Sequence, residues 1–342
     1  MKRVLLTGVA GFIGAHTLEH LLENTDWEII GIDSLKHRGK QERIDQVMAK
    51  NPDWQSRFEF IICDLAGYDY PQLDLMSIFK GSSLTDKPID YIINMAAESH
   101  VDRSITDPVP FVKNNIDLVL TMLEWARLMK PEMFIQISTD EVYGPMENGR
   151  PYAEWERHLP SNPYSASKSA QEAIAISYWR TYGVPLVITN TMNNIGEMQD
   201  PEKFVPLVIK KLLAGEEISI HGSEHDMGSR FYLHARNHAD ALLFILKNMP
   251  AALHSAKTLY PDRYHIVGDT RVGNLDMAGK IAQLIPAGLY YKFDSSIRPG
   301  HDLHYGLSDG KLHAAGWRPP LSFEESLART VENYLEHREW LN

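Results

Sequence analysis

Short apolar runs rich in Val and Ile recur along the first half of this chain, and amphipathic stretches of helical length lie between most of them. The runs span residues 4–6, 29–32, 58–62, 91–93, 134–137 and 186–188. Strands buried on both faces read as continuous apolar runs, and their alternation with helices is typical of a parallel sheet covered on both sides. The pattern therefore predicts an α/β fold with a doubly wound parallel sheet of the Rossmann type.

The alternation weakens after residue 190, where Pro and Gly break the chain into short pieces. Beyond that point the pattern predicts a helix at 236–246, a strand at 264–267 that extends the first sheet, and a final helix at 322–338. We expect a Rossmann domain of residues 1–190 plus about 235–268, and a smaller α/β substrate-binding domain of about 191–234 plus 269–342. We expect the ligand site in the cleft between these two domains.

Composition excludes several classes of protein. The net charge of −11 over 342 residues argues against a broad nucleic-acid or anionic-membrane surface. The single cysteine, Cys63, can form neither an internal disulfide nor a cysteine-cluster metal site. His301 and His304 lie three apart, but nothing supplies a full ligand set, so we expect no metal. With no apolar signal segment and no membrane-length run, we expect a cytoplasmic protein.

The first predicted strand runs into a glycine motif, G-x-x-G-x-x-G, which opens a helix. Glycines permit a tight turn and close approach of the backbone to a pyrophosphate, and the helix N-terminus supplies free N–H groups. The second strand ends at Asp33, whose carboxylate suits ribose hydroxyls and repels a 2′-phosphate. We therefore expect NAD rather than NADP, although Lys36 and Arg38 nearby favour the opposite choice. The predicted cofactor contacts are Gly8, Gly11, Phe12, Ile13, Gly14, Asp33, Asp64, Leu65, Ala96, Ala97, Tyr164 and Lys168.

Two further stretches indicate chemistry. Tyr164 and Lys168 are separated by one helical turn, so they share a helix face. An ammonium near the phenol, together with a nicotinamide cation, lowers the pKa of tyrosine and allows it to act as a base on a hydroxyl. Asp140 and Glu141 follow a buried strand directly. Two carboxyl groups this close cannot both ionise easily, so one pKa rises and the pair becomes an acid and a base.

These motifs give the chain a resemblance to the extended short-chain dehydrogenases/reductases of the nucleotide-sugar group. Within that group it most resembles the dTDP-glucose 4,6-dehydratases. The matching segments run from residue 7 to residue 302 and read TGVAGFIG, AAESHVDRSI, STDEVYG, YSASK, NNIG with PEKFVPL, and RPGHD. STDEVYG together with RPGHD is specific to the dehydratases, whereas TGxxGFIG and YxxxK are shared across the wider family.

The resemblance implies a reaction and a role for each catalytic residue. Tyr164, supported by Lys168, takes the C4 hydroxyl proton of a nucleotide-diphosphate hexose while C4 gives a hydride to NAD⁺, and Thr139 binds the C4 oxygen. Glu141 then removes the C5 proton, and Asp140 protonates the departing C6 oxygen. The hydride returns to C6 and a proton returns to C5, which leaves a 4-keto-6-deoxy sugar.

Substrate contacts also carry over by motif position. They are Ser99, Asn193, Lys203, His221, Arg230, Arg298 and His301. Several positions depart from the family pattern, and we expect them on the nucleotide side of the pocket or its supports: His221, Phe231, Arg236-Asn237, Gly196-Glu197-Met198-Gln199 and Gly268-Asp269-Thr270. UDP-linked substrates are therefore as credible as dTDP-linked ones.

Two other functions are considered. An epimerase or decarboxylase on the same scaffold needs no acid for a C6 hydroxyl, which Asp140 and Glu141 argue against. A silent NAD-binding regulatory protein would not need Tyr164 and Lys168.

Predicted helices at 110–129 and 165–182 are apolar on more than one side, which predicts a homodimer through a four-helix contact. The alternative is a monomer in which another part of the chain covers the second side.

Overall fold

A seven-stranded parallel sheet forms the centre of the computed structural model, which describes residues 1–67, 87–223, 226–294 and 302–342. Its order is β11-β6-β5-β4-β1-β2-β3, and every neighbouring pair is parallel. The strands are β1 (Arg3–Thr7), β2 (Glu28–Asp33), β3 (Phe58–Ile62), β4 (Tyr91–Asn94), β5 (Met133–Thr139), β6 (Leu186–Thr191) and β11 (Asp262–Ile266). The predicted doubly wound sheet is confirmed, and the strand expected at 264–267 does extend it.

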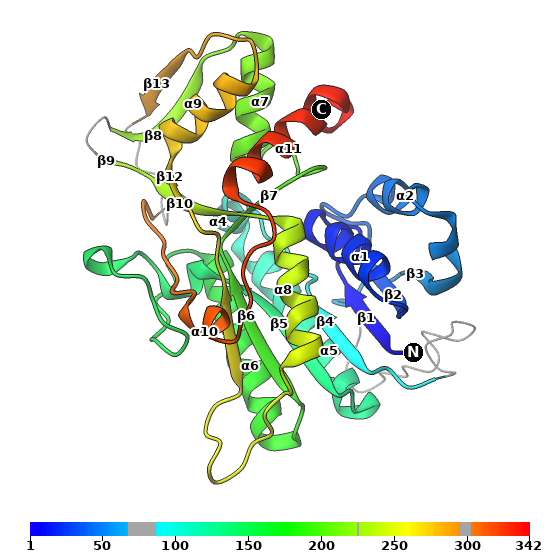
Figure 1. The fold of residues 1–342 in the computed structure, drawn as a ribbon. Helices are drawn as coiled ribbons and strands as arrows, with labels where there is room; N and C mark the ends of the chain where they lie inside the picture. Colours follow the sequence, from blue (N-terminus) through cyan, green and yellow to red (C-terminus); the bar gives the residue numbers. More distant parts are fainter. Residues whose placement is uncertain (68–86, 224–225, 295–301) are drawn as a thin grey trace.

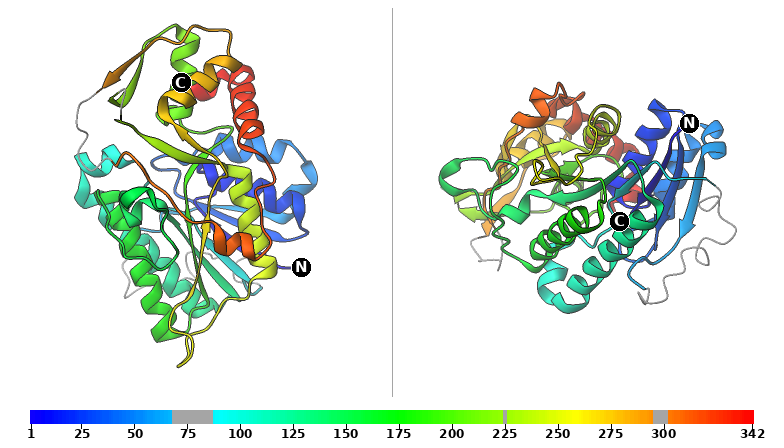
Figure 2. Two further views of the ribbon diagram at one scale, coloured as in Figure 1. Left: turned by 60° about the vertical axis from the view of Figure 1, so that its left-hand side comes forward. Right: turned by 90° about the horizontal axis from the view of Figure 1, so that it is seen from below.

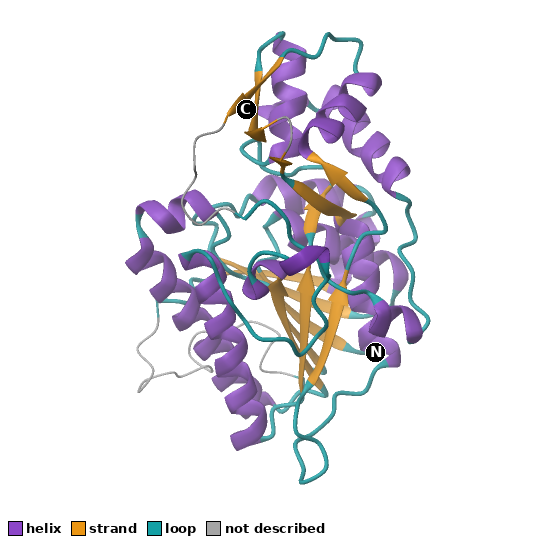
Figure 3. Cartoon of the chain, turned by 90° about the vertical axis from the view of Figure 1, so that its left-hand side faces the viewer, coloured by secondary structure: helices purple, strands orange, loops and turns teal. Residues whose placement is uncertain are grey.

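Helices cover both faces of this sheet (Figures 1 and 3). Alternate residues of β1 show why: Val4 and Leu6 join one apolar cluster, and Leu5 joins the other. The first cluster includes side chains from α1 (Phe12–Asn24), α2 (Gln41–Ala49) and α8 (Ala235–Asn248). The second includes side chains from α5 (Pro108–Met129) and α6 (Pro163–Tyr182). The short helix α4 (Val101–Thr106) contacts both α5 and α6.

Much of the chain after β6 gathers beyond the carboxyl ends of the strands (Figure 2). Two small sheets lie there, one of β7 (Asn193–Ile195), β10 (Ser229–His234) and β12 (Arg271–Gly273), the other of β8 (Ile218–Ser223), β9 (Asp226–Met227) and β13 (Tyr291–Asp294). Helices α7 (Phe204–Ala214), α9 (Asn274–Leu284) and α11 (Phe323–Glu336) accompany them, and α10 (Gly310–Ala314) packs on β11. Their apolar residues share one cluster with β1 and α1. The division into two domains stays a prediction.

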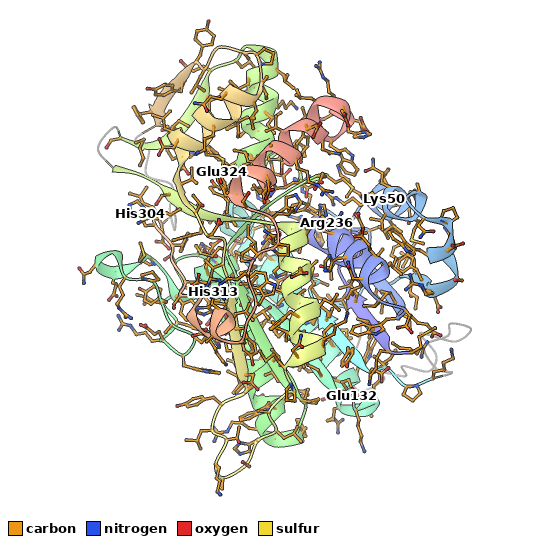
Figure 4. The ribbon with its side chains drawn as sticks, viewed as in Figure 1. Lys50, Glu132, Arg236, His304, His313 and Glu324 are labelled. Atoms are coloured by element: carbon orange, nitrogen blue, oxygen red, sulfur yellow. The ribbon has the colours of Figure 1, made fainter. Side chains whose placement is uncertain are left out.

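One departure from the family pattern has a local structural reason. Arg236, at the start of α8, pairs with Glu19 at 2.8 Å and with Glu23 at 2.6 Å, both on α1. Lys50 pairs with the same Glu19 at 2.8 Å (Figure 4). The Asn237 side chain exchanges hydrogen bonds with the backbone of Leu321. Arg236 and Asn237 thus stabilise the packing of α8, and their expected role on the nucleotide side of the pocket or in its supports stays a prediction.

Candidate active site

The glycine motif forms a tight turn between β1 and α1. Gly8 adopts a φ of 71°, which favours glycine, and a Cβ on Gly14 would lie 2.0 Å from the Gly8 carbonyl oxygen. Gly11 is the N-cap of α1 and no side chain caps the helix there, nor is any acidic residue in its first turn. The N–H groups at this end of α1 therefore face no competing side-chain acceptor, an arrangement that suits a pyrophosphate.

The residues beyond this turn suit the adenosine half of a dinucleotide. Asp33 accepts hydrogen bonds from the amides of Ala10 (3.0 Å) and Leu35 (2.9 Å), and burial raises the pKa of its carboxyl. Lys36 pairs with Asp64 at 2.6 Å, and Arg38 pairs with Glu202 at 2.9 Å. Both cations that could have favoured a 2′-phosphate are therefore already matched with carboxylates, which favours NAD.

The end of β4 lies directly against the glycine turn. A Cβ on Gly8 would come within 3.0 Å of the Ala96 backbone. The Thr7 hydroxyl donates to Asn94 Oδ1 at 3.0 Å and accepts from the amides of Met95 and Ala96, both at 3.0 Å. These contacts hold Ala96 and Ala97 at the carboxyl end of the sheet, where a small residue leaves room for a ligand. Leu65 is buried, and its carbonyl accepts from Thr121.

Asp140 and Glu141 sit in a short 3₁₀ turn, η4 (Asp140–Tyr143), immediately after β5. Thr139 caps this turn: its hydroxyl donates to Asp140 Oδ1 at 2.9 Å and accepts from the Glu141 amide at 3.3 Å. Asp140 is 5% exposed, and its Oδ2 has no hydrogen-bond partner among the described residues. Glu141 Oε2 accepts from Asn162 Nδ2 at 3.2 Å.

The two carboxyl groups have different surroundings. Burial, followed by the charge of Glu141, raises the pKa of Asp140 to about 7. Burial also raises the pKa of Glu141, but the Asn162 hydrogen bond and the charges of Arg230 and Lys203 act in the opposite direction. Glu141 thus has more support for its ionised form, whereas Asp140 is half protonated near neutrality. This is the arrangement of an acid beside a base.

Tyr164 and Lys168 lie on the first turns of α6. Lys168 is 4% exposed, and its ammonium donates to the Ile137 carbonyl and to Gln171 Oε1, both at 2.7 Å. Burial lowers the pKa of Lys168 to about 8. Burial raises the pKa of Tyr164, and the charges of Glu141 and Asp140 raise it further. The lowering of the Tyr164 pKa that we expect from Lys168 together with a nicotinamide cation stays a prediction.

The predicted substrate contacts differ in burial and in their position in the fold. Arg230 is buried near the acidic pair, and its guanidinium donates to the Asp302 carbonyl at 2.7 Å and lies 4.7 Å from the centre of the Tyr305 ring. Lys203, the N-cap of α7, is close enough for its charge to act on Glu141. Ser99 and Asn193 are exposed, and His221 on β8 lies 3.8 Å from Asp294. Arg298 and His301 lie outside the described residues.

No cluster of three metal-ligating side chains occurs in the described ranges. The same part of the chain contains no helix long and apolar enough to span a membrane.

The model of the NAD dependent epimerase/dehydratase family matches residues 4–258. The chain belongs to this family. It is 34% identical to dTDP-glucose 4,6-dehydratase of Salmonella typhimurium, with 99% of this chain and 94% of that protein covered. It is 33% identical to DesIV, the dTDP-glucose 4,6-dehydratase of Streptomyces venezuelae, whose crystal structure has NAD bound. The TM-score is 0.84, with 99% and 98% of the two chains covered.

A UDP-glucose 4-epimerase of Thermus thermophilus, also in complex with NAD, is 26% identical with a TM-score of 0.82, covering 97% of this chain and 99% of that one. The family resemblance read from the sequence motifs and the expectation of NAD are both confirmed.

Two side chains near the acidic pair were not predicted from the sequence. Asn162 caps α6 through a capping box with Ser165, and its amide also binds Glu141. The Asn-Pro step before YSASK is a helix-start signal that could have identified it. The second side chain is Tyr305. Burial raises the pKa of its phenol, and the charges of Glu141 and Asp302 raise it further. Nothing in the local sequence indicates that position.

Proposed function

We propose that the protein is an NAD-dependent nucleotide-diphosphate hexose 4,6-dehydratase. The observation that supports this best is the buried pair Asp140 and Glu141, in which the pKa of one carboxyl is raised to about 7 while the other is supported by Asn162, Arg230 and Lys203. Elimination of water needs one group to take a proton and another to give one. A 4-epimerase has no leaving hydroxyl to protonate and needs no such acid.

The residues around the glycine turn fit NAD. The uncapped start of α1 at Gly11 and the close contact of Gly14 with Gly8 suit the pyrophosphate, and Asp33 suits the adenosine ribose. Lys168, on the first turns of α6, is proposed to hold the nicotinamide ribose. The NAD held by these residues would supply a reversible hydride acceptor, so that the hydride lost at C4 could be regained at C6 while C5 takes up a proton.

The proposed proton transfers use this chain's own side chains. Tyr164 takes the proton of the C4 hydroxyl, while Thr139 donates a hydrogen bond to the C4 oxygen. A positive charge near the phenol is required, because burial and the two carboxylates hold the pKa of Tyr164 above its ordinary value. The 4-ketone makes the C5 proton acidic, and Glu141 removes it. Asp140, protonated in part at neutral pH, gives its proton to the leaving C6 oxygen, which departs as water.

The nucleotide diphosphate is proposed to lie toward Asn193, Lys203, His221 and Arg230, with Ser99 near the sugar. Cations suit this role because phosphate oxygens accept hydrogen bonds in the fork geometry of arginine. Arg298 and His301 are proposed as further contacts on the strength of the RPGHD motif. The relatives act on dTDP-glucose according to their names, and UDP-linked hexoses remain equally credible substrates.

A homodimer through α5 and α6 and a cytoplasmic location belong to the same proposal. On α6 the residues Ala166 and Ala173 are exposed and Ile174 and Ile176 are half-buried, so this helix keeps an open side. Cys63, the single cysteine of the chain, is buried and forms no disulfide, as suits a reducing compartment.

The test is incubation with dTDP-glucose, UDP-glucose, UDP-GlcNAc and GDP-mannose, followed by mass spectrometry. We expect loss of one water from at least one of them. Inversion at C4 with no change in mass would instead establish an epimerase. An absence of both, in protein that carries NAD, would contradict the proposal.

A further inference from the structure

Glu172 is a buried carboxylate that the proposed chemistry does not use. Its partners contact the turn that carries the acidic pair. Glu172 on α6 is 0% exposed. Its Oε1 accepts a hydrogen bond from Asn190 Nδ2, on β6, at 2.8 Å. Its Oε2 lies 2.5 Å from Nη2 of Arg263, on β11, which is 1% exposed. Glu172 therefore joins the helix that carries Tyr164 to two strands of the sheet.

Each partner of Glu172 reaches one end of the turn that carries the acidic pair. Asn190 Nδ2 also donates to the Thr139 carbonyl at 3.1 Å, at the start of the turn. Arg263 Nη1 donates to the Tyr143 hydroxyl at 2.8 Å, at its end. Asp140 and Glu141 lie between these two anchors. The Asn190 contact and the Arg263 contact form two arms that both start from the Glu172 carboxylate, although the residues involved are far apart in sequence.

The backbone of the turn supplies few hydrogen bonds of its own. A 3₁₀ turn has poorer hydrogen-bond geometry than an α-helix, and η4 contains only four residues. Tyr143 is 1% exposed and receives further support from His265 Nε2 and the Glu154 carbonyl, both 2.9 Å from its hydroxyl. His158 Nε2 lies 3.4 Å from Glu172 Oε2 and 3.1 Å from Arg263 Nη1, so it completes the buried group.

Stability alone is a weak reason for this arrangement. Replacing a buried ion pair by apolar residues of similar volume is often neutral or stabilising, because two charges must be removed from water. Precise placement of reacting groups is a stronger reason, since an error of about 1 Å can lower a rate about 100-fold. A second layer of hydrogen bonds is what supplies such precision.

We propose that Glu172, acting through Asn190 and Arg263, is a positioning residue that holds Asp140 and Glu141 in their reacting geometry. It touches neither substrate nor cofactor in this role. The inference rests on the proposed function for its effect on rate, but the anchoring of the turn can be measured without any substrate.

The experiment compares Glu172→Gln and Tyr143→Phe with wild type. Glu172→Gln removes the carboxylate charge that Asn190 and Arg263 share. Tyr143→Phe leaves the Arg263–Glu172 pair intact and removes the hydroxyl that Arg263 contacts, together with its contacts to His265 and the Glu154 carbonyl. Glu19→Gln is the matched control, because Glu19 is also a buried helical carboxylate, with Lys50 and Arg236 as its partners. Hydrogen–deuterium exchange is followed in the peptide spanning residues 139–144, and kcat and KM are measured on the substrate that wild type dehydrates.

In both test variants we expect exchange in that peptide to accelerate about tenfold or more. We expect kcat to fall about 10- to 100-fold with KM and NAD content near wild type. Glu19→Gln should change neither kcat nor exchange at 139–144. Should Glu172→Gln fail to fold, Tyr143→Phe carries the test.

Unchanged exchange at 139–144 in both variants, or a lowered melting temperature with kcat unchanged, would overturn the proposal. A wild type that dehydrates no nucleotide sugar would instead refute the proposed function. The exchange measurement would still decide whether Glu172 anchors the turn.

Discussion

Asp140 should make the water-elimination step depend on pH near neutrality. Burial and the neighbouring Glu141 raise the pKa of Asp140 from 3.8 to about 7. At pH 7 about half of the molecules therefore carry the proton that the leaving oxygen needs, whereas an ordinary aspartate would carry it in roughly one molecule in 1,600. Because the protonated form of Asp140 is the active one, the rate should halve near pH 7 and fall tenfold per unit above it. Protonation of the base Glu141, whose pKa burial also raises, should lower the rate on the acid side.

The assay is a single turnover in rapid mixing between about pH 5.5 and pH 9, a range that brackets the Asp140 pKa. Absorbance of the reduced nicotinamide reports C4 oxidation, and quenched samples report water loss by mass. Separate readouts are needed because Lys168, with a pKa lowered to about 8, titrates in the same range and acts on the oxidation step.

Asp140→Asn should lower elimination about 10²- to 10⁴-fold and remove its fall above pH 7, while C4 oxidation survives. Asp53→Asn, at an exposed site on η1 (Pro52–Arg57), is the control. An elimination rate that rises with pH through 7, or an Asp140→Asn variant with the wild-type profile, would refute the assignment of Asp140 as the acid.

Three further predictions concern single side chains. Glu141→Gln should slow exchange of the C5 proton with solvent deuterium about 10²- to 10⁴-fold while NAD and the sugar nucleotide still bind in equilibrium dialysis, and wild-type exchange would remove Glu141 as the base. Tyr164→Phe should abolish C4 oxidation in a single turnover, because no phenol oxygen is left to take the hydroxyl proton; oxidation at the normal rate would require another base. Ala173→Glu, on the open side of α6, should reduce the proposed dimer to single chains in sedimentation equilibrium, whereas Ala328→Glu, exposed on α11, should not. Wild-type protein that sediments as a single chain at all micromolar concentrations would contradict the dimer.

The sheet was predictable because its signal is local. Each apolar run from residue 4 to residue 188 lies within or overlaps one of the strands β1 to β6, since a strand buried on both faces has few polar residues. Helix ends were less accurate. Helix α5 begins at Pro108 rather than 110, because proline is favoured in the first turn and both positions carry it. Helix α6 begins at Pro163 after its Asn162 cap.

Contacts between distant segments could not be predicted. The ion pair of Arg263 with Glu172 and the bond of Arg263 to Tyr143 depend on β11 adding to the sheet beside β6. Spacing along α6 correctly suggested that Tyr164 and Lys168 are neighbours on one helix. It could not show that the long Lys168 side chain reaches back to the Ile137 carbonyl, since that depends on how α6 packs against β5.

The fate of the C4 hydrogen tests the proposed dehydration most directly. A nucleotide hexose deuterated at C4, chosen from those that react, is incubated with the protein and the product is examined by NMR and mass spectrometry. We predict that one water is lost and that the deuterium is found at C6 of a 4-keto-6-deoxy sugar, with a solvent proton at C5. Deuterium returned to C4, in a product of unchanged mass with inverted configuration, would show that the protein is an epimerase and contradict the proposed function.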